Sequence, residues 1–154
     1  MIALFAVNSL IVACVVVLHY EFLFRMTLWV SRMKVRHRLR ILFGVVGALI
    51  AHAIEVWIFA FAYYLMDRAE GWGHLEGNTD GGLLDCVYFS FTTFTTLGFG
   101  DIQPIGDLRY LTGIEALTGL VLITWTASFC SSRCSATGIP AKRSADQRSG
   151  RALG

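Results

Sequence analysis

Charged residues are scarce in this sequence, and that scarcity limits the class of protein it can encode. Asp, Glu, Lys and Arg make up 16% of the 154 residues and apolar residues 55%, whereas charged residues make up about 25% of an ordinary soluble protein. This imbalance indicates contact with lipid. The four cysteines are scattered and do not suggest a disulfide framework. No internal repeat is visible, and no grouping of nucleophile, base and orienting residue suggests an enzyme.

Three apolar stretches are long enough to cross a bilayer core of about 30 Å, which requires roughly 20 helical residues. We assign them to an N-terminal helix over 1–24 and to helices over 41–66 and 109–130. A cleaved signal peptide is a less favoured interpretation of the first stretch, because no basic residue precedes it and no A-x-A-like site follows it.

A fourth apolar stretch, residues 83–94, is too short to span and follows a Gly-rich hydrophilic loop over 67–82. Apolar runs of this length are typical of re-entrant segments. The predicted fold class is therefore an all-α integral membrane protein with three transmembrane helices and a short re-entrant helix between the second and third.

Basic residues predict the orientation of these helices. They are concentrated in a linker over 25–40 and a tail over 131–154, whereas the loop between the second and third spans is acidic. The positive-inside rule then places the N-terminus outside and the C-terminus in the cytoplasm of a multi-pass protein of the cell membrane. The tail is rich in Ser, Gly, Ala and Arg without apolar periodicity, so we expect it to be largely disordered.

The segment after the re-entrant stretch, residues 95–101, alternates glycine with residues that carry side chains. Glycine readily adopts positive φ, and alternating backbone handedness can turn successive carbonyl oxygens the same way. Four such strands around an axis would form stacked rings of oxygens able to replace the hydration shell of an ion.

Residues 96–100, Thr-Leu-Gly-Phe-Gly, resemble the TVGYG signature of potassium channels, and the flanking Thr95 and Asp101 also match. The resemblance covers a pore domain over 41–130, with an outer helix, a pore helix over 83–94, a filter over 95–101 and an inner helix. The extra N-terminal helix departs from the minimal two-helix channel, and we expect it at the periphery of the pore, facing lipid.

The resemblance implies a homotetramer, because each chain supplies one filter strand, and no cofactor besides the permeant ion. K⁺ would be coordinated by the backbone of the filter and the Thr96 hydroxyl. The implied ion-binding residues are Thr96, Leu97, Gly98, Phe99 and Gly100, with K⁺ on the carbonyls of the first four, and the implied supporting residues are Thr92, Thr93, Thr95 and Asp101.

Two departures from the family pattern bear on selectivity. Phe99 replaces the usual Tyr and removes a hydrogen bond that braces the filter, and Thr92 lies where some relatives have a buried carboxylate. A weakly selective cation channel and a non-conducting regulatory or scaffold subunit are the alternatives to a potassium channel.

The inner helix contains two candidates for a gating hinge, Gly113 and Gly119. Helical spacing below Gly119 predicts a cavity lining, made of Leu120, Ile123, Thr124 and Ala127.

Ionisable residues within spans are candidates for function by default. His52 and Glu55 lie three apart on one face of the second span, and Glu115 lies in the third. One interpretation is that they sense protons or a metal. The other, which is favoured, is that they form a hydrogen-bonded set that holds the helices together.

The basic residues from Arg32 to Arg40 recur at every second position, so on a helix they would not form the single stripe of a voltage sensor. We expect them to contact anionic lipid headgroups, or to act only as a topology signal. Nucleic acid is not an expected partner.

Overall fold

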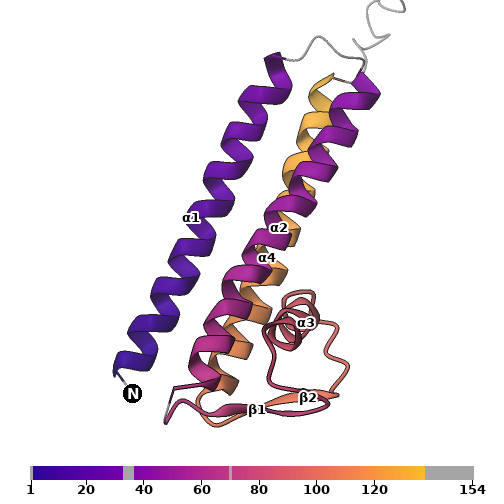
Figure 1. Ribbon diagram of the computed structural model, residues 1–154. Coiled ribbons are helices and arrows are strands. Elements are labelled where there is room, and N and C mark those ends of the chain that lie inside the picture. Colours follow the sequence, from indigo (N-terminus) through magenta and orange to yellow (C-terminus); the bar gives the residue numbers. More distant parts are fainter. Residues whose placement is uncertain (1, 33–36, 70, 138–154) are drawn as a thin grey trace, which may run out of the picture.

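Three long helices dominate the computed structural model, which describes residues 2–32, 37–69 and 71–137. They are α1 (Ile2–Arg32), α2 (His37–Asp67) and α4 (Leu108–Thr137), and α2 runs antiparallel to the other two (Figure 1). All three are long and apolar enough to cross a membrane. The expected all-α membrane fold is confirmed.

The short apolar stretch forms α3 (Leu83–Phe94), which lies beside α2 and α4 near the end of the molecule where α1 begins (Figure 1). Its first turn is stabilised by Asp85, whose carboxylate accepts hydrogen bonds from the backbone N–H groups of Asp80 and Gly82 at 2.9 and 3.2 Å and from the Thr79 hydroxyl at 3.0 Å. These bonds satisfy donors in the turn that leads into the helix. The negative charge of the carboxylate also complements the positive N-terminal end of the helix dipole.

A two-stranded antiparallel sheet, which the sequence analysis did not predict, joins the two ends of this region. Strand β1 (His74–Gly77) pairs with β2 (Ile102–Ile105), with His74 opposite Ile105. The chain therefore leaves the sheet, forms α3 and residues 95–101, and returns to the same place (Figure 1).

The main core lies where α2, α3 and α4 meet. It includes Phe59 and Tyr63 from α2, Phe94 from α3, and Leu111 and Leu122 from α4, all at most 1% exposed. Burial of such side chains stabilises the fold by about 1.5–3 kcal/mol each. This packing determines where the C-terminal end of α3 lies.

Three expected helix boundaries are wrong. Helix α1 continues to Arg32 and α2 begins at His37, so most of the segment 25–40 is helical and not a linker. Residues 21–32 contain no Gly or Pro to end the helix, and Arg25 pairs with Glu21 one turn away at 2.6 Å. Helix α4 likewise continues to Thr137 into the expected tail, while residues 138–154 lie outside the described part of the chain.

Helix α1 packs against α2 and α4 through one stripe of buried side chains and does not face lipid on all sides. The stripe repeats at intervals of four and seven residues, as one face of a helix does. It consists of Leu4, Asn8, Val15, His19 and Leu23. The opposite side, with Leu10 and Val17, is exposed in the single chain.

Candidate functional site

The segment after α3 has the alternating backbone that its glycines suggested. Thr96, Gly98 and Gly100 have φ values of 58°, 51° and 80°. Thr96 is the only non-glycine residue with positive φ among those described, a conformation that costs a residue with a Cβ about 1–2 kcal/mol. The alternation thus extends over three positions, one of which is strained.

Hydrogen bonds to the end of α3 determine where the carbonyl groups of this segment point. The N–H groups of Leu97 and Gly98 both donate to the Thr92 carbonyl, at 2.8 and 3.1 Å, and that of Thr96 donates to the Thr93 carbonyl at 2.9 Å. The described peptide bonds are not cis, and in a trans peptide the C=O points opposite to the N–H. The carbonyls of residues 95, 96 and 97 therefore all point away from α3.

The side chains around this segment differ in burial. Thr92 and Thr93 are each 7% exposed, and the Thr92 hydroxyl donates to the Phe89 carbonyl at 2.9 Å. By contrast, residues 95–101 are exposed in the single chain, including the apolar Leu97 at 60% and Phe99 at 65%. Two large apolar side chains exposed together are a common feature of interaction surfaces.

The C-terminal end of the segment is held by contacts that were not predicted from the sequence. The Tyr88 hydroxyl donates to the Asp101 carboxylate at 2.8 Å, and the Asp101 carbonyl accepts a bond from the N–H of Asn78 at 2.9 Å. The Tyr88 ring also lies parallel to that of Phe99, with centroids 6.4 Å apart. The bond to Asp101 raises the pKa of the Tyr88 phenol.

Glu115 connects three helices. Its carboxylate, which is fully buried, accepts hydrogen bonds from the Tyr63 hydroxyl on α2 at 2.6 Å and from the Ser90 hydroxyl on α3. Ser90 also lies 3.0 Å from the Val56 carbonyl. The favoured interpretation of Glu115, a hydrogen-bonded group that holds helices together, agrees with these contacts.

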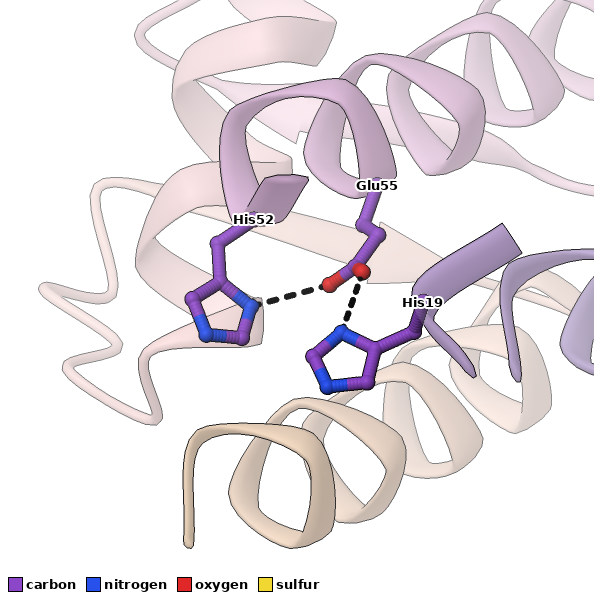
Figure 2. A group of neighbouring side chains, drawn as sticks. All are labelled: His19, His52 and Glu55. Atoms are coloured by element: carbon purple, nitrogen blue, oxygen red, sulfur yellow. Dashed lines mark hydrogen bonds and ion pairs between the residues drawn. The ribbon is translucent and has the colours of Figure 1, made fainter. Parts of the chain in front are cut away.

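His52 and Glu55 belong to a second buried group, which includes a residue from α1 (Figure 2). The Nδ1 atoms of His19 and His52 lie 2.7 and 2.9 Å from the two carboxylate oxygens of Glu55. On its other side, Nε2 of His19 lies 3.2 Å from the Thr126 hydroxyl on α4. The group therefore joins α1, α2 and α4.

His19 was missed because α1 was expected to face lipid. A histidine in the middle of an apolar span was a sufficient signal, since such a residue requires a polar partner. Tyr88 carried no comparable signal, because its pairing with Asp101 depends on the turn between them.

The two hinge candidates lie in different surroundings. A Cβ on Gly119 would lie 2.1 Å from the Phe94 carbonyl oxygen, so this glycine permits the close contact of α4 with the end of α3. Gly113 is exposed, with nothing within 4 Å of a Cβ. The predicted cavity-lining residues share an exposed side of α4, and they are Leu120, Ile123, Thr124 and Ala127.

The proposed lipid-contacting residues fall largely outside the described structure. Arg32 ends α1 and is exposed. Lys34 and Arg36 lie outside the described residues, as do the side chains of Arg38 and Arg40.

Comparison with known proteins identifies one family for this chain. A family model described as "Ion channel" matches residues 51–136, more than half of the sequence. The match covers most of α2, all of α3, the segment 95–101 and nearly all of α4. Neither the curated proteins nor the solved structures contain a match.

Proposed function

The chain belongs to the ion channel family, and from this membership we propose that it is one subunit of a homotetrameric channel that conducts K⁺ passively across the cell membrane. Residues 96–100 are the selectivity filter in this proposal. The N-terminus and the α3 region lie outside, and the basic ends of the long helices lie in the cytoplasm, as the distribution of Lys and Arg favours.

The direction of the filter carbonyls is the observation that carries the proposal. The carbonyls of residues 95, 96 and 97 point to one side, away from α3. Around a fourfold axis each position would supply a ring of four oxygens, the arrangement that replaces the hydration shell of K⁺. The observed direction covers two of the four proposed ligand carbonyls, those of Thr96 and Leu97. In this proposal the carbonyls of Gly98 and Phe99 complete the set, and Thr92 and Thr93 support the filter from behind.

Exposed apolar surface beside the filter supports assembly of identical chains. A shallow groove is lined by side chains of α3 and of the filter, including Leu84, Tyr88, Phe91, Leu97 and Phe99. All five are at least 38% exposed. A filter surrounded by three neighbouring chains would cover this surface, whereas a single chain leaves it bare.

The experiment uses purified protein in vesicles with opposed K⁺ and Na⁺ gradients, in which the reversal potential measures the permeability ratio. We expect a strong preference for K⁺. A thousandfold preference corresponds to about 4 kcal/mol for the tetramer, or about 1 kcal/mol per chain, so a small change in the filter can abolish it. Equal permeabilities would show a weakly selective cation channel instead.

A pair of matched glycine variants tests whether the filter conducts. Gly98→Ala places a side chain at φ 51°, and Gly81→Ala does so at φ 71° in the outer loop; neither Cβ meets an atom within 4 Å. The two substitutions therefore impose similar backbone strain, and only the first alters the filter. We expect Gly98→Ala to abolish flux and Gly81→Ala to preserve it. Unchanged flux in Gly98→Ala would refute the assignment of the filter.

A further inference from the structure

We propose that His19, His52 and Glu55 form a binding site for a divalent transition metal of the Zn²⁺ class, which fastens α1 to the pore domain. The three residues come from two helices and each offers one ligand atom (Figure 2). These atoms all lie within 4.8 Å of one another. The site is separate from the filter, so the inference goes beyond conduction of K⁺.

The donor set selects the class of metal. Two imidazole nitrogens and one carboxylate oxygen are a frequent ligand set for Zn²⁺, with the fourth position open to water. Co²⁺ and Ni²⁺ accept the same donors. Ca²⁺ and Mg²⁺ prefer sites built entirely of oxygen, and the site therefore discriminates against them.

Thr126 provides the hydrogen-bond partner that a metal-bound histidine needs for its other ring nitrogen. A histidine that binds metal through one ring nitrogen usually donates a hydrogen bond from the other. In His19 the Nδ1 atom faces Glu55, and Nε2 lies 3.2 Å from the Thr126 hydroxyl. On metal binding, the proton of each neutral imidazole moves from Nδ1 to Nε2, and in His19 Nε2–H then donates to Thr126. A hydroxyl can donate or accept, so Thr126 can serve both forms.

Burial gives a positive ion a reason to bind. Glu55 and His19 are fully buried, and the Trp125 and Phe94 rings lie 5.5 and 5.8 Å from the imidazoles of His19 and His52. An ionised carboxylate is costly in such surroundings unless a positive charge compensates it, and neutral imidazoles supply none. The His52 side chain is 16% exposed and provides the edge by which an ion can enter.

The position of the site suggests what a bound metal does. Its ligands belong to α1 and α2, and Thr126 connects it to α4, whereas the matched ion channel region begins only at residue 51. A metal would therefore stabilise the packing of the additional helix on the pore domain.

The test is a Co²⁺ titration of the full-length protein in detergent after treatment with a chelator. Tetrahedral Co²⁺ with nitrogen ligands absorbs visible light, so the absorption reports binding without any measurement of flux. We expect one Co²⁺ per chain, displacement by Zn²⁺ but not by Ca²⁺, and a higher unfolding temperature with Zn²⁺. Absence of Co²⁺ absorption at saturating metal would refute the site.

Asparagine variants distinguish a metal ligand from a structural hydrogen bond. His19→Asn and His52→Asn keep an amide N–H near the position of Nδ1 and remove the imidazole ligand. Since loss of an outer-shell partner weakens metal binding about 10–100-fold, we expect loss of a ligand to weaken it by at least about 100-fold.

His74→Asn changes an exposed histidine of β1 and should bind Co²⁺ as the unaltered protein does. Equal affinity in all three variants would show that the cluster is held by hydrogen bonds alone and would overturn the proposal. If one variant does not fold, the other and Glu55→Gln answer the same question. A protein that binds Co²⁺ but does not conduct would refute the proposed function and leave this inference intact.

Discussion

Among the described residues, two carboxylates are fully buried, those of Glu115 and Glu55, and they have different partners. Glu115 accepts hydrogen bonds from two hydroxyls, which belong to Tyr63 and Ser90. Glu55 faces two imidazoles, from His19 and His52. Hydroxyls keep one chemical form over the physiological range, whereas imidazoles can gain a proton or bind a metal.

The two groups also connect different helices. The Glu115 group joins α2, α3 and α4, and all of its members lie within the region matched by the ion channel family. The Glu55 group brings in α1, which lies outside that region. The connection within the matched region is thus made by a carboxylate and two hydroxyls, and the connection to α1 by a carboxylate and two side chains of a type that binds metals.

Removing the Glu115 carboxylate should have the largest effect on stability. Glu115→Ala leaves the hydroxyls of Tyr63 and Ser90 buried without this acceptor. Ser90 keeps the Val56 carbonyl as an acceptor, and Tyr63 keeps the Thr112 hydroxyl. Each lost bond should therefore cost toward the low end of about 1–3 kcal/mol. We expect a total loss of about 2–3 kcal/mol, measured by thermal unfolding of the protein in detergent. Glu115→Gln is the control, because its amide can still bond both hydroxyls and should cost much less. An equal loss in both variants would show that charge, and not the acceptor, matters here.

Phe94 lies close to Gly119 of α4, and its ring also faces His52 of the Glu55 group. Gly119→Ala would place a Cβ 2.1 Å from a backbone oxygen and force α3 and α4 apart. Overpacking of this kind costs about 1–3 kcal/mol. In Gly113→Ala the Cβ meets nothing within 4 Å, and alanine favours a helix by about 1 kcal/mol over glycine. We therefore expect opposite shifts in unfolding temperature, and shifts of the same sign would contradict the assigned packing.

Hydropathy and glycine spacing were enough to predict the three long helices, the short helix over 83–94 and the segment 95–101, because each depends on local sequence. The sheet was not predictable in this way, since β1 and β2 are four residues each and pair across α3. The partners of His19, unlike its need for one, could not be predicted for the same reason, because they lie 36 and 107 positions away. Contacts between distant segments depend on how helices pack, and a hydropathy pattern contains little of that information.

Thr126 tests whether the Glu55 group is truly joined to α4. Thr126→Val removes the hydroxyl beside His19 and preserves the shape of the side chain, so we expect a loss of about 0.5–1.5 kcal/mol. The control is Thr124→Val, because the Thr124 hydroxyl bonds the Leu120 carbonyl within α4 and is exposed. It should change the unfolding temperature little. If the two variants behave alike, the connection of α1 to α4 through His19 has no energetic importance.

A third carboxylate, that of Asp85, lies in the first turn of α3, outside the three long helices. Hydrogen bonds from the N–H groups of Asp80 and Gly82 and from the Thr79 hydroxyl lower its pKa below the ordinary 3.8. Since the folded pKa is the lower one, its contribution to stability is fully present above pH 3.8 and is lost as the pH falls through the folded pKa.

We expect this contribution to be about 0.5 kcal/mol or less, because solvent screens the group. Unfolding temperatures measured from neutral pH to below 3.8 should show a small acid-dependent decrease that Asp85→Asn removes. Asp80→Asn alters a neighbouring exposed carboxylate and keeps the backbone N–H that bonds Asp85, so the decrease should persist. An identical pH profile for the Asp85→Asn variant and the unaltered protein would show that this carboxylate does not stabilise the start of the pore helix.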